Sequence, residues 1–295
     1  MTIYAHHPEP TNPLGLAGIE FIEYATTQPQ ALGAVLQTMG FVPVARHRSR
    51  EVMLYRQGGM NLIVNAHPEA LPGLPPPSPV PVLSAIALRV RDAGAAWKHA
   101  LDHGAWEMPT RASAMELNIP GVHGVGDSLL YFVDRHGDFS IYDVDFTPLP
   151  GVDPRPPAVA GLHYFGVVQT ILDGRTDDWV DFYRVLFGFD VLPGGQYFGI
   201  LPKGTLLASP GGRFYLQLIE PPEGAEDIEW EERLLRVGLG APDVPAAVRT
   251  LRERGVVFID RDPIQPTDRG ALTQIYLAGV TFELVASTLD PKGAA

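Results

Sequence analysis

The sequence predicts an α+β fold of four βαβββ modules, which pair into two domains with cupped, half-open barrels. Three observations carry this prediction. Strand and helix patterns recur in the same order along the chain, matching segments lie on both sides of the midpoint, and a proline-rich stretch separates the halves. A recurring order of elements is the signature of a repeated structural unit. Side chains from opposite strands of a cupped sheet converge, so each cup is a place for a ligand.

The opening segments of the two halves match each other. In the first half, residues 18–25 (GIEFIEYA) are typical of a strand, and residues 31–39 of the helix that follows it. In the second half, residues 161–168 (GLHYFGVV) predict the strand and residues 177–186 (DDWVDFYRVL) the helix, whose apolar side chains recur at three-to-four spacing. A Gly-Phe pair and a further strand follow each helix.

A second pair of segments continues the match. Residues 85–90 (AIALRV) predict a strand that leads through Asp92 into a helix, and residues 237–241 lead through Asp243 into another helix. Each half therefore contains two units of the same kind.

Residues 149–157 (LPGVDPRPP) are the best candidate for an interdomain linker. Proline fixes φ and lacks a backbone donor, so this run cannot continue a helix or a sheet. We therefore predict an N-terminal domain at residues 1–150 and a C-terminal domain at residues 158–289.

Composition limits the classes of function. Hydrophobic residues make up 45% of the chain and charged residues 19%, which is enough apolar surface to form a core. The formal net charge is -12, and an acidic surface repels phosphate backbones, so we expect no nucleic-acid partner. The chain has no cysteine, which excludes disulfides and thiolate metal sites.

The same reading predicts a cytoplasmic protein without a membrane segment. Residues 1–13 lack the basic start and apolar stretch of a signal peptide. No run of about eighteen apolar residues occurs, so no helix is expected to cross a membrane. Domains of this kind often pair, and a homodimer is the assembly to test first.

Several segments carry a family resemblance. In the first half these are residues 18–25, 54–65 (LYRQGGMNLIVN) and 130–146 (LYFVDRHGDFSIYDVDF), and in the second half residues 161–168 and 280–285 (VTFELV). The chain resembles 4-hydroxyphenylpyruvate dioxygenase, of the vicinal oxygen chelate (glyoxalase/bleomycin resistance/dioxygenase) superfamily. The resemblance implies a first domain without metal and a second domain that holds one non-heme Fe(II) through two histidines and a glutamate. It implies a dioxygenase acting on an aromatic 2-oxo acid, with decarboxylation coupled to hydroxylation.

The resemblance assigns two metal ligands. The family's first histidine lies on the opening strand of the second domain, where this chain has His163, and its glutamate lies on the last strand, where this chain has Glu283. We expect both side chains to project into one cup, because the first and last strands of a closed module are taken to be neighbours.

The position of the family's second histidine is occupied by Arg236. An arginine stays protonated and has no lone pair for a metal. If Arg236 points into the cup, its charge takes the place of a dication beside Glu283, because a guanidinium and a carboxylate form a planar pair. A buried Glu283 without a cation would be costly. We therefore expect Arg236 to pair with Glu283 or to bind an anionic ligand.

Two further residues are candidates for substrate binding. Gln274 lies where the family uses a glutamine, and Ser209 precedes a proline in a turn that resembles one of the family's. Gln274 is equally typical of an exposed strand residue, and Ser209 of an ordinary turn.

Three functions follow from this reading and stay open. The first is the iron-dependent dioxygenase that the resemblance implies. The second is a divergent, metal-free enzyme that converts a small anionic or phenolic compound with Arg236, Glu283 and His163 as charged and acid–base groups. The third is a non-catalytic protein that binds such a ligand in the cup. A shared fold does not separate these functions.

Overall fold

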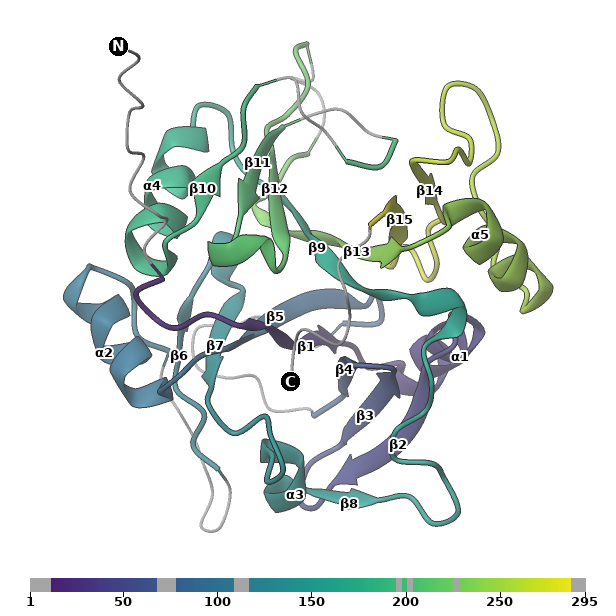
Figure 1. Ribbon diagram of the computed structural model, residues 1–295, viewed down its shortest axis with the longest axis horizontal. Coiled ribbons are helices and arrows are strands. Elements are labelled where there is room, and N and C mark those ends of the chain that lie inside the picture. Colours follow the sequence, from purple (N-terminus) through teal and green to yellow (C-terminus); the bar gives the residue numbers. More distant parts are fainter. Residues whose placement is uncertain are drawn as a thin grey trace, which may run out of the picture.

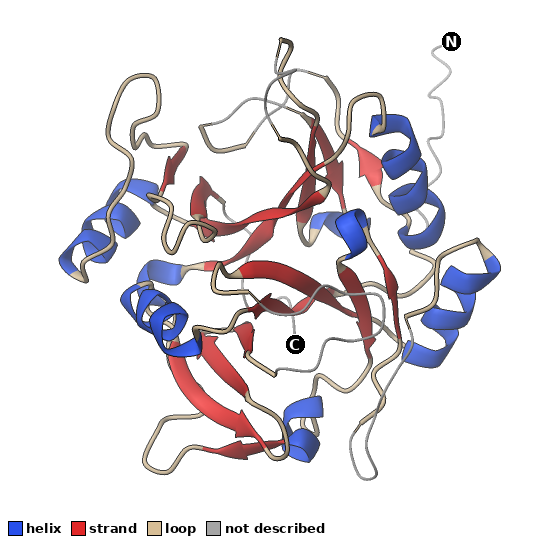
Figure 2. Ribbon diagram, turned by 180° about the vertical axis from the view of Figure 1, so that it is seen from behind, coloured by secondary structure: helices blue, strands red, loops and turns tan. Residues whose placement is uncertain are grey.

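The computed structural model describes residues 12–67, 78–108, 117–194, 198–200, 204–224 and 229–287. Mixed strands and a few helices make this an α+β fold, as predicted. Figure 2 shows the helices lying around the outside of the strands. Within the described ranges, no helix is both long enough and apolar enough to span a membrane.

The first half contains two successive sets of strands and helices (Figure 1). The first set is β1 (Gly18–Ala25), α1 (Pro29–Thr38), β2 (Val42–His47), β3 (Val52–Gln57) and β4 (Met60–Asn65). The second set is β5 (Val82–Arg89), α2 (Ala93–Asp102), β6 (Gly121–His123), η1 (Val125–Asp127), β7 (Leu129–Val133), α3 (Ile141–Asp145) and β8 (Phe146–Pro148).

The second half has a similar order, but within the described residues only two strands follow its last helix. Its first set is η2 (Val159–Gly161), β9 (His163–Thr170), α4 (Thr176–Phe187), β10 (Asp190–Val191), β11 (Thr205–Ala208), η3 (Pro210–Gly212) and β12 (Tyr215–Ile219). Its second set is β13 (Arg233–Ala241), α5 (Val244–Glu253), β14 (Gly270–Leu272) and β15 (Phe282–Ala286). The strands and helices that the repeated patterns predict are present at the expected places.

The helices α2 and α5 start in the same way. The carboxylate of Asp92 accepts a hydrogen bond from the N–H of Ala95, and the carboxylate of Asp243 accepts one from Ala246. Each side chain satisfies a backbone donor that the first turn of a helix leaves without a partner. The two aspartates that follow the matching strands are therefore helix caps.

The strands form one continuous sheet. Its order is β10-β11-β12-β9-β13-β5-β1-β4-β3-β2-β8, and the halves meet where Leu234 of β13 pairs with Leu83 of β5. In the second half β13 lies between β9 and β15, pairing antiparallel with β9 and parallel with β15. The expectation that the first and last strands are neighbours is therefore wrong, because the opening strand of the last module separates them.

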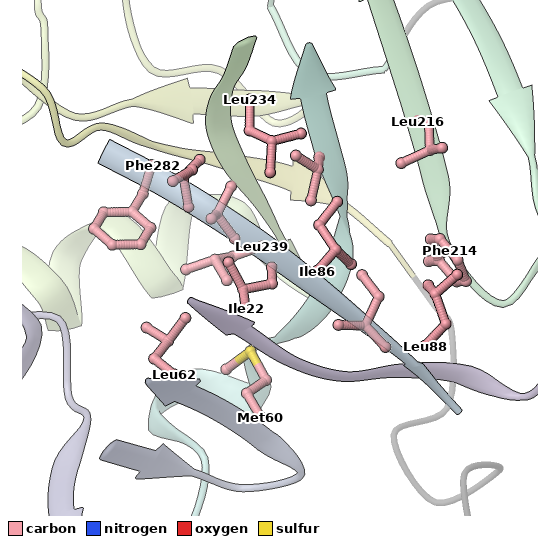
Figure 3. Packing of buried hydrophobic residues seen from close by; sticks show 14 of the residues in the cluster. Ile22, Met60, Leu62, Ile86, Leu88, Phe214, Leu216, Leu234, Leu239 and Phe282 are labelled. Carbon is pink, nitrogen blue, oxygen red and sulfur yellow. The ribbon is translucent and has the colours of Figure 1, made fainter. Parts of the chain in front are cut away.

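The hydrophobic core is shared by both halves. One cluster of buried side chains includes Ile22 and Leu62 from the first half and Leu239 and Phe282 from the second, as Figure 3 shows. Burial of apolar side chains is the main stabilising contribution to such a fold.

The predicted linker contains neither helix nor strand and lies against the first half. Its carbonyl groups at Pro154 and Pro156 accept hydrogen bonds from Arg56 Nη1 (2.8 Å) and from the N–H of Gly58 (2.9 Å). Just beyond it, the N–H of Val159 donates to Gln57 Oε1 over 2.9 Å. The division into two domains stays a prediction.

Candidate functional site

The three predicted site residues lie on the same face of the second-half sheet. Arg236, Gly238 and Gly240 alternate along β13 and so point to one side. Gly238 pairs with Glu283 of β15, and Gly240 pairs with His163 of β9. Gly238 and Gly240 have no side chains, so they leave space on this face. The His163 ring fills the space at Gly240, where a Cβ would collide with it.

Arg236 and Glu283 form a buried ion pair. Arg236 Nε lies 2.9 Å from Glu283 Oε2, and the two side chains are 7% and 5% exposed. Nη2 of Arg236 is also buried, and it has no hydrogen-bond acceptor among the described residues. The guanidinium therefore neutralises Glu283 and keeps buried donors that a second acceptor would satisfy.

A short loop segment closes over Glu283. The N–H of Ile200 donates to the carboxylate. Oε1 of Glu283 occupies the space that a Cβ at Gly199 would need, and Gly199 has a φ of +65°. Glycine adopts this conformation without strain. Burial raises the pKa of Glu283, while the Arg236 charge and the Ile200 hydrogen bond act in the opposite direction.

His163 is held at the other end of the same face. Its Nε2 lies 3.0 Å from Ser287 Oγ, and its Nδ1 lies 3.1 Å from the carbonyl oxygen of Gly161. A neutral ring that donates from Nδ1 to Gly161 and accepts at Nε2 from the Ser287 hydroxyl fits both contacts. Burial lowers the pKa of His163, which also favours the neutral form. No described contact joins His163 to Arg236 or Glu283.

An aromatic cluster lies beside Glu283. The Phe165 ring is 4.8 Å from both the Phe198 and Tyr215 rings, and Phe198 and Tyr215 are 4.7 Å apart. These rings, Gly238 and Glu283 line a cavity of about 30 Å³. A cavity of this size holds about one water molecule. A larger ligand would have to displace one of the rings.

Sequence reasoning missed this aromatic cluster. Phe165 follows His163 on the strand that the sequence already singled out, so this position carried a usable signal. Phe198 lies outside the helices and strands, and no periodicity predicts its contact with Tyr215.

The two predicted substrate-binding residues lie outside these contacts. Ser209 is buried in the turn between β11 and β12, where its Oγ accepts a hydrogen bond from the N–H of Phe214 over 3.0 Å. Gln274 follows β14 and is exposed. Its backbone N–H donates to the carbonyl of Val257. Roles for both side chains stay predictions.

The residues present do not fit a facial triad of two histidines and a carboxylate. Arg236, which the resemblance puts at the position of one ligand, has no lone pair for a metal, and its guanidinium lies against the carboxylate of Glu283. Nε2 of His163 is engaged with Ser287. Across the described parts of the chain, no group of three or more His, Cys, Asp or Glu side chains is arranged to hold a metal.

The comparisons with known proteins decide the family. Residues 10–147 match the family described as "Hydroxyphenylpyruvate dioxygenase, HPPD, N-terminal". The chain is 34% identical over 267 residues to 4-hydroxyphenylpyruvate dioxygenase of Pseudomonas aeruginosa (strain PAO1), and the match covers 85% of this chain and 73% of that enzyme. The chain belongs to the 4-hydroxyphenylpyruvate dioxygenase family. It is thus a member of the vicinal oxygen chelate superfamily, as the resemblance implied.

Two further matches show how much of other family members the chain spans. It is 40% identical over 225 residues to 4-hydroxyphenylpyruvate dioxygenase of Pseudomonas sp. (strain P.J. 874), covering 74% of this chain and 62% of that enzyme. A solved "xylose isomerase-like TIM barrel/4-hydroxyphenylpyruvate dioxygenase fusion protein" has the same fold, with a TM-score of 0.71 and 24% identity over 96% of this chain and 51% of that one. The family's fold therefore also occurs joined to another domain.

Proposed function

We propose that this family member binds a small aromatic carboxylate, such as an aromatic 2-oxo acid, in its second half without iron. The observation that carries the proposal is the buried guanidinium of Arg236 beside Glu283, with donors left over for a second carboxylate. A guanidinium binds carboxylates through paired hydrogen bonds, and burial strengthens such bonds.

The neighbouring side chains favour a ligand with an aromatic part. Phe165, Phe198 and Tyr215 offer ring faces and edges next to Glu283, and aromatic rings stack or meet edge to face at the separations seen here. Entry of such a ligand displaces Phe198, because the present cavity holds about one water molecule.

The experiment is calorimetric titration of the chain with phenylpyruvate and with 4-hydroxyphenylpyruvate in the presence of a chelator. We expect saturable binding by the unaltered chain and loss of about tenfold or more in affinity for Arg236→Met, because a charge-assisted hydrogen bond is removed. Arg184→Met is the control, since Arg184 is exposed on α4 and forms a solvent-exposed ion pair with Asp181. Equal affinities of the two variants would overturn the proposal.

An iron-dependent dioxygenase is the second candidate, and membership of the family favours it. Its test is oxygen uptake with 4-hydroxyphenylpyruvate after incubation with Fe(II). Turnover that a chelator abolishes would support this candidate, and binding without turnover would support the first.

We also propose that the two halves are the two cupped domains that the sequence predicts, at residues 1–150 and 158–289. The repeated element order supports this division, as does the position of the linker between β8 and β9. The proposed ligand site lies in the second of these domains.

A further inference from the structure

A groove in the first half carries a concentration of positive charge that the second-half site does not explain. Arg46 near the end of β2 and Arg48 and Arg50 in the turn that follows lie within five residues, in a chain whose net charge is -12. The three side chains line a groove of about 520 Å³. This volume lies in the range of small-molecule sites.

The groove is charged on one side and apolar on the other. Val52, Met53, Tyr55 and Val64 form its apolar wall, and Pro29 and Gln30 at the start of α1 line it as well. No side chain caps the N-terminus of α1, so this helix end adds partial positive charge. Among the lining residues within the described ranges, Glu51 is the single carboxylate.

Two of the arginines have charges that no carboxylate compensates. Within the part of the chain that the structure describes, neither Arg46 nor Arg48 lies at ion-pair distance from an acidic side chain. Arg48 reaches only the backbone, where its Nη2 donates to the carbonyl of Asp143 over 3.4 Å. Arg46 and Arg48 have one residue between them in the sequence. Their guanidinium groups carry like charges, which repel each other unless an anion lies between them.

The turn that carries Arg48 and Arg50 is held in place, and Arg46 is fixed on β2. Nδ1 of His47 accepts hydrogen bonds from the N–H groups of Ser49 and Arg50, both over 3.2 Å. The His47 ring also meets the Phe146 ring edge to face at 5.2 Å. Because the turn is already ordered, ligand binding costs less conformational entropy.

We propose that this groove binds a small organic anion. Its phosphate or carboxylate group lies between Arg46 and Arg48, and its apolar part lies against Val52 and Met53. The site is separate from the one around Arg236 and does not depend on it.

The experiment is calorimetric titration of the full chain with phenyl phosphate, benzoate and inorganic phosphate. The double variant R46A/R48A is compared with R184A/R252A, which removes two exposed arginines from α4 and α5 and so changes the net charge equally. We expect affinity to fall about tenfold or more in R46A/R48A and to be unchanged in the control. The probe whose affinity falls in R46A/R48A identifies the head group that the arginines bind. A higher affinity for phenyl phosphate than for inorganic phosphate measures how much the apolar wall contributes to binding.

Two results would overturn this inference. One is the absence of saturable binding of every probe by the unaltered chain up to about 10 mM, which is weaker than specific small-molecule binding. The other is equal affinity in R46A/R48A and the unaltered chain, which would place the bound anion elsewhere. Thermal unfolding of both double variants controls for loss of structure.

Discussion

At the scale of single residues, the second-half site depends on which cation lies beside Glu283. A carboxylate in the position of Glu283 is stable in a buried place only when something positive lies beside it. In this chain the guanidinium of Arg236 supplies that charge at 2.9 Å. Arg236 therefore balances the charge of Glu283, and a guanidinium has no lone pair with which to bind a metal.

This balance makes a prediction about stability. Replacing Arg236 by Met leaves Glu283 buried without its partner, and breaking a buried pair in this way costs about 3–5 kcal/mol. Urea unfolding of Arg236→Met measures the loss. Arg184→Met is the matched control, because its exposed pair with Asp181 is worth about 0–1 kcal/mol. A loss no larger than that of the control would show that Glu283 needs no cation.

The raised pKa of Glu283 predicts a pH dependence. The folded chain holds the Glu283 proton to a higher pH than the unfolded chain, so folding is favoured at low pH and this contribution is lost as pH rises through the folded pKa. Glu283→Gln removes the titration. We expect the free energy of unfolding of the unaltered chain, minus that of Glu283→Gln, to fall as pH rises above the ordinary pKa of glutamate. A difference that rises with pH would mean that the pKa of Glu283 is lowered instead.

Part of this site could be predicted from the family resemblance and the residue types together. The resemblance placed Arg236 and Glu283 on strands of one cup, and charge balance predicted that Arg236 pairs with Glu283 or binds an anionic ligand; the structure contains the pair. The contact between His163 and Ser287 could not be predicted, because it depends on the register of two strands that do not pair directly.

At the scale of elements, the segment 198–200 packs against the site. It places Phe198 in the aromatic cluster and the N–H of Ile200 on Glu283, and Gly199 lies between them with a positive φ. A side chain at Gly199 would collide with Oε1 of Glu283.

Gly199→Ala therefore carries two penalties. The left-handed backbone costs a non-glycine residue about 1–2 kcal/mol, and the collision with Glu283 adds to it. Gly174→Ala is the matched control, since Gly174 has a φ of +71° and no heavy atom near its absent Cβ. We expect Gly199→Ala to lower the melting temperature more than Gly174→Ala. Equal losses would show that the loop yields without strain.

The order of the strands was the main element-scale feature that the sequence did not predict correctly. Periodicity identified β9, β13 and β15 as strands but gave no pairing between them. A usable signal lay in their composition, because β9 and β13 are buried along almost their whole length, which is typical of strands with covered faces on both sides. Such strands lie in the middle of a sheet, as β13 does here.

At the scale of the whole molecule, the two halves have related folds but different sites. Both halves bury an ion pair, Arg89 with Glu20 in the first and Arg236 with Glu283 in the second, and only the first half has the outer groove lined by arginines described above. The repeat that predicted the fold could not predict this groove, because it arises from individual side chains. Contacts between the halves, such as the hydrogen bond from Tyr164 to the carbonyl of Asn61, join both sites to one framework.

Iron content of the purified chain tests the central claim most directly. The chain is incubated with Fe(II) without oxygen, desalted and analysed for metal, alone and after chelation. Because Arg236 occupies the cation's place beside Glu283, we expect no iron to be retained above the level of the chelated sample. Retention of one iron per chain would contradict the account, since the guanidinium would then have given way to a metal.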